Sequence, residues 1–173
     1  MATLQLEHKF DPNRKRHYLN GQTAVLHCHH YATLFTQLAI DAKELVDGIR
    51  ILQETAADVF GEMLAAHFKT HGVTDPAARI DLGVQLFSAL GLGKMIAAGL
   101  TEAGGTVEMP FAHVDAGWLK KWGPAKHPVN HFGAGYIAGL MAAAYDKPFR
   151  SYKVVETQSL VQGAKTSIFK VSR

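Results

Sequence analysis

The segment that most constrains the fold of this chain is an apolar helix interrupted by glycine. Residues 129–148 read VNHFGAGYIAGLMAAAYDKP, and the apolar spacing predicts a helix that ends before Pro148. Each glycine lowers helix stability by about 1 kcal/mol relative to alanine. Because glycine has no side chain, another backbone can come close to it. We therefore predict that Gly133, Gly135 and Gly139 mark an obligate packing contact, for which a second subunit is one candidate.

Three more helices are predicted upstream of this segment. The first follows from three- and four-residue apolar spacing between Tyr31 and Leu45. The second spans residues 49–72 and ends at Gly72. The third begins near Pro76, which sits where a helix accepts proline, after a cap by Thr74 or Asp75. We expect the second helix to bury one apolar face, made of Leu52, Ala56, Val59, Phe60, Met63, Leu64 and His67.

Strands are predicted near the N-terminus, at residues 105–114 and near the C-terminus. RHYLNGQTAVLH reads as a β-hairpin, because Asn20-Gly21 suits a type I′ turn. GTVEMPFAHV and FRSYKVVETQSLVQGAKTSIFKVS are rich in residues that favour strands, and the second is expected to turn near Gly163. GLGK at 91–94 lacks the spacing of a phosphate-binding loop and is interpreted as a flexible helix end.

This order of elements predicts the fold class. Strands, several helices, a strand, a helix and a terminal hairpin favour an α+β fold, in which an antiparallel sheet packs against several helices. With 173 residues and 47% apolar composition, the chain is expected to form a single small-molecule-binding domain over residues 1–173. The N-terminal hairpin segment would occupy residues 1–28.

Composition and charge exclude several functional classes. The net charge is +3, and the densest basic cluster, NRKRH at 13–17, is too short to predict a nucleic-acid partner. No apolar run reaches the length of a membrane span or of a signal peptide, so no membrane association is expected. The single cysteine, Cys28, fits a reducing environment. We expect a soluble, cytoplasmic protein.

The C-terminal third, residues 125–173, carries the motifs of a known family. Gly135 and Gly139 match a GxxxG helix, and Glu156 matches a glutamate on the strand that follows. Gly163 matches a glycine turn before the last strand. On these residues the segment resembles the 4-vinyl-reductase, or hydrocarbon-binding, domain family. The resemblance implies an α+β fold related to that of vesicle-tethering subunits, a small-molecule ligand such as an aromatic compound, and a homodimer.

The resemblance also concerns a metal. Some members hold a structural zinc with three cysteines and the glutamate. The corresponding positions here are Asn130, Ser159, Ser167 and Glu156. Hydroxyls and an amide do not replace thiolates as zinc ligands, so we expect this zinc site to be absent. Glu156 should then accept hydrogen bonds from Ser159, Ser167 or Asn130, because an unpaired buried carboxylate is costly.

Histidines are the most distinctive candidate site residues. HCHHY at 27–31 places three imidazoles around Cys28, and HPVNH places His127 and His131 one helical turn apart. Histidine binds phenols and carbonyls well, since one ring nitrogen donates while the other accepts. Trp118, one turn from Trp122, could stack on an aromatic ligand. The predicted ligand-binding residues are His27, His29, His30, His113, Trp118 and His131.

Three interpretations stay open at this point. The first is a small-molecule-binding protein whose pocket takes an aromatic or tetrapyrrole-like ligand anchored by histidines. The second is a metal-dependent enzyme with iron or zinc, since histidines with one carboxylate are typical of non-haem iron sites. The third is a dimeric adaptor or assembly factor that uses the glycine-lined helix. The candidate metal ligands are His29, His30, His127, His131 and Glu156.

Overall fold

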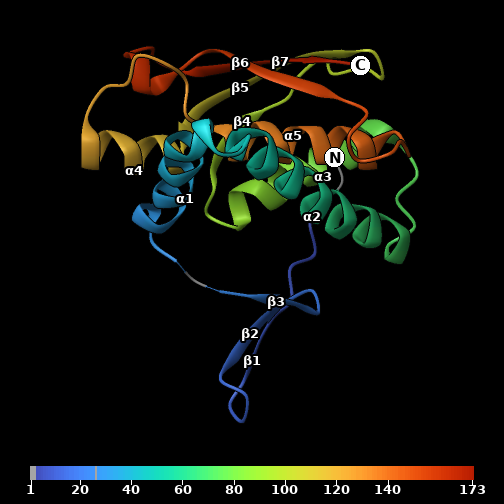
Figure 1. Cartoon of the computed structure of the whole chain (residues 1–173). Coiled ribbons are helices and arrows are strands. Elements are labelled where there is room, and N and C mark those ends of the chain that lie inside the picture. The colour runs from blue at the N-terminus through green and yellow to red at the C-terminus, as the bar shows by residue number, and fades with distance from the viewer. Residues whose placement is uncertain (1–2, 26) are drawn as a thin grey trace.

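The computed structural model describes residues 3–25 and 27–173. A small antiparallel sheet comes first, with strands β1 (His8–Asp11), β2 (Arg16–Leu19) and β3 (Gln22–Ala24) in that order. The predicted hairpin turn is confirmed, because Asn20 and Gly21 join β2 to β3 with φ values of 47° and 79°. Figure 1 shows that this sheet projects away from the rest of the molecule.

The body of the molecule contains five helices and a second sheet within the described residues. Its helices are α1 (His29–Asp41), α2 (Gly48–Thr70), α3 (Pro76–Ala89), α4 (His113–Trp122) and α5 (His131–Ala144). Two 3-10 turns are η1 (Ala42–Glu44) and η2 (Leu160–Gln162). The strands are β4 (Gly93–Ile96), β5 (Gly104–Ala112), β6 (Lys153–Gln158) and β7 (Ser167–Ser172).

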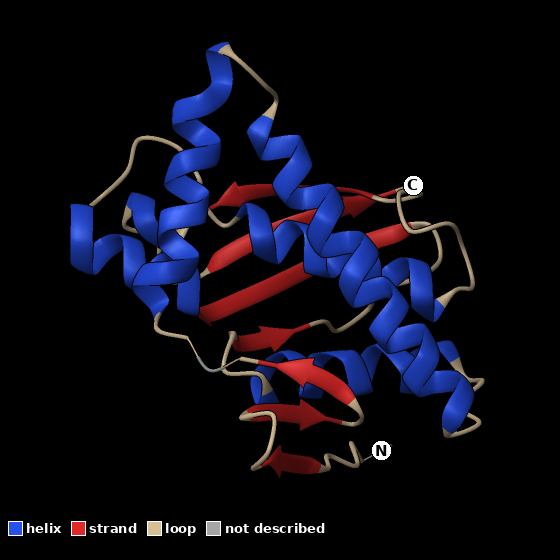
Figure 2. Ribbon diagram, turned by 60° about the horizontal axis from the view of Figure 1, so that its bottom comes forward, coloured by secondary structure: helices blue, strands red, loops and turns tan. Residues whose placement is uncertain are grey.

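The body has the predicted α+β architecture. Its four strands lie in the order β4-β5-β7-β6, and every neighbouring pair is antiparallel. The helices gather on one face of this sheet (Figure 2). The long helix α2 packs mainly against α5, which in turn packs against β6. None of the described helices is both long enough and apolar enough to cross a membrane.

Helix α5 confirms the close contact that its glycines predict, and the partner is α2 of the same chain. A Cβ atom on Gly135 would collide with the carbonyl oxygen of Gln53, and one on Gly139 would lie 2.5 Å from the carbonyl oxygen of Ala57. Nearly all of α5 is buried by these contacts and by the sheet. Gly135 and Gly139 therefore serve packing within the chain, whereas Gly133 faces the side chain of Asn130 and makes no such contact. From Gly133 to Ala144 every residue of α5 is buried, which leaves no exposed surface there for a subunit.

The buried face of α2 differs from the predicted stripe. Ala57, Gly61 and Phe68 point inward, whereas Val59 is 52% exposed. The close approach of α5 explains the difference, because only small residues fit where two backbones nearly touch. A Cβ atom on Gly61 would lie 2.6 Å from the Phe149 ring. An apolarity pattern alone favours large residues and so misplaces this face.

Two elements in the middle of the chain were not expected. The segment 91–94, interpreted as a flexible helix end, does follow the end of α3, but its last two residues, Gly93 and Lys94, begin strand β4, whose Met95 is buried. The strand expected over GTVEMPFAHV ends at Ala112, and helix α4 begins at His113. Helix α3 begins as predicted, because the Asp75 carboxylate accepts a hydrogen bond from the Ala78 N–H at 2.9 Å.

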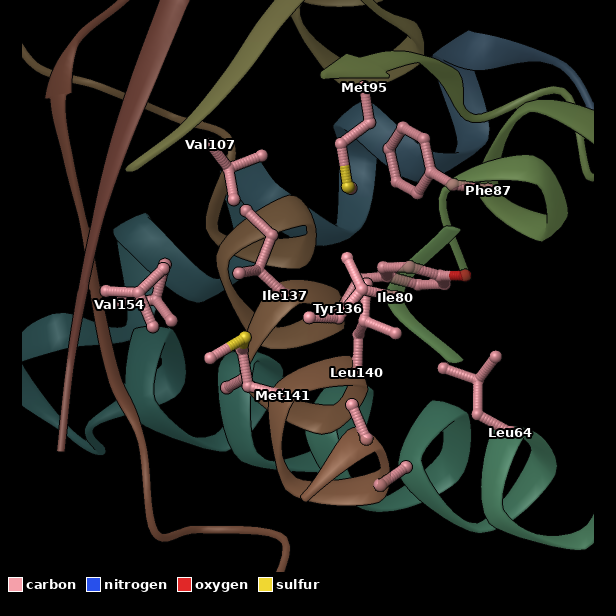
Figure 3. Close-up of a cluster of buried hydrophobic side chains, with 14 of the residues drawn as sticks. Leu64, Ile80, Phe87, Met95, Val107, Tyr136, Ile137, Leu140, Met141 and Val154 are labelled. Carbon is pink, nitrogen blue, oxygen red and sulfur yellow. The ribbon is translucent and has the colours of Figure 1, made fainter. Parts of the chain in front are cut away.

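The space between the sheet and α5 is filled by a hydrophobic core (Figure 3). Tyr136 is fully buried at its centre and donates a 2.7 Å hydrogen bond to the carbonyl oxygen of Gly83. Phe87 packs edge-on against the Tyr136 ring. Side chains therefore fill the central part of the space between α5 and the sheet.

Candidate functional site

A cavity of about 960 Å³ opens between the helices and the outer strand β6. Its walls come from α1, the first half of α2, the end of α4, the 123–130 loop, the start of α5, and β6. This volume is at the upper end for a small-molecule site. Its apolar lining residues are Ile40, Ile49, Ala57, Trp118, Trp122, Val129, Ala134, Ala138, Phe149, Tyr152, Val154 and Val155.

Both tryptophans of the chain lie in the wall of this cavity. Trp118 and Trp122 are one turn apart on α4, and their ring centroids are 4.8 Å apart. Trp118 is buried, whereas Trp122 is partly exposed near the mouth, with the Lys121 ammonium 4.6 Å from its ring centroid. The pair offers aromatic surface from the interior of the cavity to its opening. The predicted role of Trp118 as a wall fits this position.

His131 lines the same cavity from the first turn of α5. Its place is fixed by Asn130, whose Oδ1 accepts a 2.9 Å hydrogen bond from the Gly133 N–H and so caps the helix. Burial lowers the pKa of His131, which favours the neutral imidazole. The His131 ring makes no hydrogen bond to any described residue. It can therefore donate one hydrogen bond and accept another from a ligand.

Next to His131 lies a buried polar cluster at the four positions that correspond to the family's zinc ligands. The Asn130 N–H donates a 3.2 Å hydrogen bond to Glu156 Oε2, which confirms the partner expected for this carboxylate. Burial raises the pKa of Glu156, although the hydroxyls of Ser159 and Ser167 and the Asn130 N–H oppose the shift. The donor set contains no thiolate and no imidazole and does not fit zinc.

Asp115 is a fifth member of this cluster and was missed by sequence reasoning. Its side chain is fully buried, and Oδ2 accepts hydrogen bonds from Asn130 Nδ2 at 3.4 Å and Ser167 Oγ at 3.5 Å. Burial, and then the charge of Glu156, raise the pKa of Asp115 to about 7. Asp115 Oδ1 and Glu156 Oε1 are buried without a hydrogen-bond partner. Recognising α4 would have placed Asp115 inward, on the same turn as Trp118.

The remaining candidate histidines form a separate group. The ring centroid of His113 lies 5.6 Å from that of His27 and 5.8 Å from that of His29. The ring of His30 is tilted by 46° against that of His29, with the centroids 4.2 Å apart. Burial, together with His27 and His29, lowers the pKa of His113. The Nε2 atoms of His29 and His113 are buried and have no partner.

The structure does not bring all candidate ligands together. His127, His131 and Glu156 line the large cavity, whereas His29, His30 and His113 do not. His27 instead lines a smaller cavity of about 340 Å³, between the N-terminal sheet and α2. Across residues 3–25 and 27–173, no three histidine, cysteine, aspartate or glutamate side chains are grouped closely enough to hold a metal ion. The predicted five-residue metal set is therefore split between two places.

Comparison with known proteins adds information at the level of the fold. No protein-family model matches the sequence, and no curated protein matches it. Among solved structures, the crystal structure of the phenol-responsive sensory domain of the transcription activator PoxR with phenol is similar, with a TM-score of 0.78 and 12% sequence identity. The match covers 95% of this chain and 84% of that one.

A second solved structure connects the fold to the family that the sequence resembles. It is a vinyl-4-reductase family protein from Methanocaldococcus jannaschii, with a TM-score of 0.59 and 16% sequence identity. The match covers 86% of this chain and 83% of the other. The prediction from the C-terminal motifs is thus confirmed for the fold. This chain has the α+β fold of a vinyl-4-reductase family protein and of the PoxR sensory domain.

Proposed function

We propose that this protein binds an apolar, aromatic small molecule in the 960 Å³ cavity. The observation that carries the proposal is the convergence of both tryptophans and a partner-free, half-buried His131 on one cavity. An aromatic ligand stacked on Trp118 would gain from burial and ring contact, and His131 would fix its orientation through a hydroxyl or carbonyl group. A tetrapyrrole-like ligand also falls within this size class.

Similarity to the PoxR sensory domain supports this proposal. That domain is described as phenol-responsive and was crystallised with phenol. Phenol is much smaller than a cavity of about 960 Å³, so a larger aromatic ligand suits this chain better. The exposed single thiol of Cys28 fits a reducing compartment, and we propose that the protein acts in the cytoplasm.

Tryptophan fluorescence gives a direct test, because the chain has two tryptophans and both line the cavity. Purified protein without a histidine tag is titrated with the neutral fluorophore N-phenyl-1-naphthylamine, and energy transfer from tryptophan to the probe is recorded. We expect saturable transfer with one probe per chain. His131→Gln keeps a hydrogen-bonding group but removes the imidazole ring, so we expect binding to weaken by about three- to tenfold, the worth of one ring contact.

The matched control is His67→Gln. His67 is also half-buried, but it lines the smaller cavity beside the N-terminal sheet. Its replacement should leave probe binding unchanged. Absence of saturable transfer, or a larger effect from His67→Gln than from His131→Gln, would refute binding in the large cavity.

We also propose that two copies of the chain associate through α1. This helix buries its threonines, Thr33 and Thr36, against the body and turns large apolar side chains outward. Both hydroxyls are satisfied locally, and Thr33 Oγ1 donates a 2.6 Å hydrogen bond to the carbonyl oxygen of His29. The outward apolar face, continued into the α1–α2 corner, consists of Tyr31, Leu34, Phe35, Leu38, Leu45, Val46 and Ile51.

The size of this apolar face favours a second copy of the chain as its partner. The seven side chains together expose on the order of 600 Å², which approaches the roughly 800 Å² per partner of a stable interface. In a two-fold dimer the same apolar face meets itself, so no other partner is needed. Analytical ultracentrifugation should show a dimer at micromolar concentration and a monomer for Phe35→Glu. A monomeric wild-type protein would refute this proposal.

A further inference from the structure

Basic residues outnumber acidic residues in the lining of the large cavity. Five basic side chains line it, and the acidic residues among its lining are Glu54 and Glu156. The basic residues are Lys43, Arg50, Lys126, Arg150 and Lys153.

The two arginines are already neutralised by neighbouring carboxylates. Glu54 lies 3.0 Å from Arg50 and 2.9 Å from Arg150. Arg150 also pairs with Asp58, and Arg50 with Asp47. Glu54 is thus paired with both guanidinium groups and forms no ion pair with a described lysine.

Glu156 does not neutralise the lysines either. Its Oε2 atom accepts a hydrogen bond from the Asn130 N–H, and its Oε1 atom is shielded from solvent. The carboxylate therefore belongs to the buried cluster with Asp115 rather than to the open part of the cavity.

The Lys43 ammonium lies 3.9 Å from the Glu44 carboxylate. Lys126 and Lys153 remain as cations without a counter-charge, since neither forms an ion pair with any described residue. Both are held in place at the backbone. The carbonyl oxygen of Lys126 accepts a 2.9 Å hydrogen bond from Gln162 Nε2, and Lys153 begins strand β6, where it pairs with Ser172. Their flexible side chains are exposed, but their backbone positions are fixed by the fold.

We propose that the ligand of this cavity is an anionic amphiphile: an apolar, aromatic body with a carboxylate, sulfonate or phosphate group that pairs with Lys126 or with Lys153. Lys153 begins β6 and Lys126 lies beside Gln162, beyond the other end of this strand, so one acidic group pairs with one of the two lysines. This inference rests on the proposed binding function and names the class of ligand. The apolar body lies against the tryptophans and the alanines of α5. The acidic group stays near the mouth, where water and the lysines solvate it, so that no charge has to be buried.

A pair of fluorescent probes separates this inference from the proposed function. N-phenyl-1-naphthylamine is neutral, and 8-anilino-1-naphthalenesulfonate carries the same aromatic skeleton with one sulfonate. Each is titrated into wild-type protein and into the double variant Lys126→Gln/Lys153→Gln, with energy transfer from tryptophan as the signal. Because the two probes differ in apolarity, the quantity compared is the change in affinity of each probe between wild type and variant.

We expect the double variant to weaken binding of the sulfonate probe by about three- to fivefold, as the loss of one partly exposed ion pair would. Binding of the neutral probe should change less than twofold. Raising the salt concentration from about 0.05 M to 0.5 M should weaken sulfonate binding to the wild type and have little effect on the variant. The matched control, Lys165→Gln/Lys170→Gln, removes two exposed lysines that do not line the cavity and should change neither affinity.

Equal affinity changes for the two probes, or none for the sulfonate, would overturn the anionic class while leaving binding of the neutral probe intact. An equal loss of sulfonate affinity in the control variant Lys165→Gln/Lys170→Gln would also overturn it, since the net charge of the protein would then explain the effect. If neither probe transfers energy, the proposed function fails, and this inference fails with it.

Discussion

Asp115 is the residue whose chemistry departs most from that of a free side chain. It is fully buried beside Glu156, and its pKa is raised to about 7. A raised carboxyl pKa means that the folded state binds the proton more tightly than the unfolded state does. The resulting stability is fully present below the unfolded pKa, near 4, and is lost as pH rises through about 7.

Replacing Asp115 with asparagine should therefore flatten the dependence of stability on pH. Three pKa units correspond to about 4 kcal/mol, so the wild type should lose up to that amount from Asp115 between pH 4 and pH 8. Asp115→Asn should lack this loss. Urea denaturation, followed by circular dichroism, gives the free energy of unfolding of both proteins at pH 5 and at pH 8. The change between the two pH values is then compared for wild type and variant.

The pH dependence of stability must be compared between variant and wild type, because the buried histidines make stability rise with pH whereas Asp115 makes it fall. The lowered pKa values of His113 and His131 reduce stability as pH falls through the titration range of free histidine. Asp41→Asn, which changes an exposed carboxylate, should retain the wild-type profile. An unchanged pH profile for Asp115→Asn would contradict the account of the buried cluster.

At the scale of elements, the contact between α2 and α5 is the feature most sensitive to a single methyl group. In an exposed helix, replacing glycine with alanine raises stability by about 1 kcal/mol. Gly139→Ala should do the reverse, because the new methyl group would meet the carbonyl oxygen of Ala57 and the backbone nitrogen of Gly61. We expect a loss of about 1–3 kcal/mol in the free energy of unfolding. A neutral or stabilised variant would show that the two backbones are not in contact.

Most elements could be predicted from local signals, and the exceptions have local causes. The Asp75 cap and the Asn20-Gly21 turn are read from two or three residues each. Strand β4 could not be found in this way, because Gly93 adopts a φ of 136° and pairs with β5 across the sheet. Helix α4 was not predicted, because the residues before it continue a strand pattern and no capping side chain marks its start.

Sequence patterns singled out some of the residues that line the cavity, but not how they assemble. Trp118, His131 and Glu156 do line the cavity. The second imidazole group, around His113, lies outside it, since the route of the chain from the N-terminal sheet into α1 leads past the start of α4. Which side chains meet depends on how distant helices pack, and spacing along the sequence does not contain that information.

At the scale of the whole molecule, the cavity and the proposed dimer surface lie on different sides of α1. Gln37 and Ile40 line the cavity, whereas Tyr31, Phe35 and Leu38 point to the solvent. Phe35→Glu should therefore produce a monomer that binds N-phenyl-1-naphthylamine within about twofold of the wild type. Sedimentation and fluorescence titration of the same sample test this independence. Loss of probe binding together with dimerisation would contradict it.

The central claim is that the cavity lined by Trp118 and Trp122 is the ligand site, and the indole N–H resonances of the two tryptophans test it most directly. In a ¹⁵N-labelled sample these two signals are assigned with Trp122→Phe and followed during titration with N-phenyl-1-naphthylamine. We predict that both indole signals shift and saturate at one probe per chain. Saturable binding that leaves both indole signals unmoved would contradict the claim.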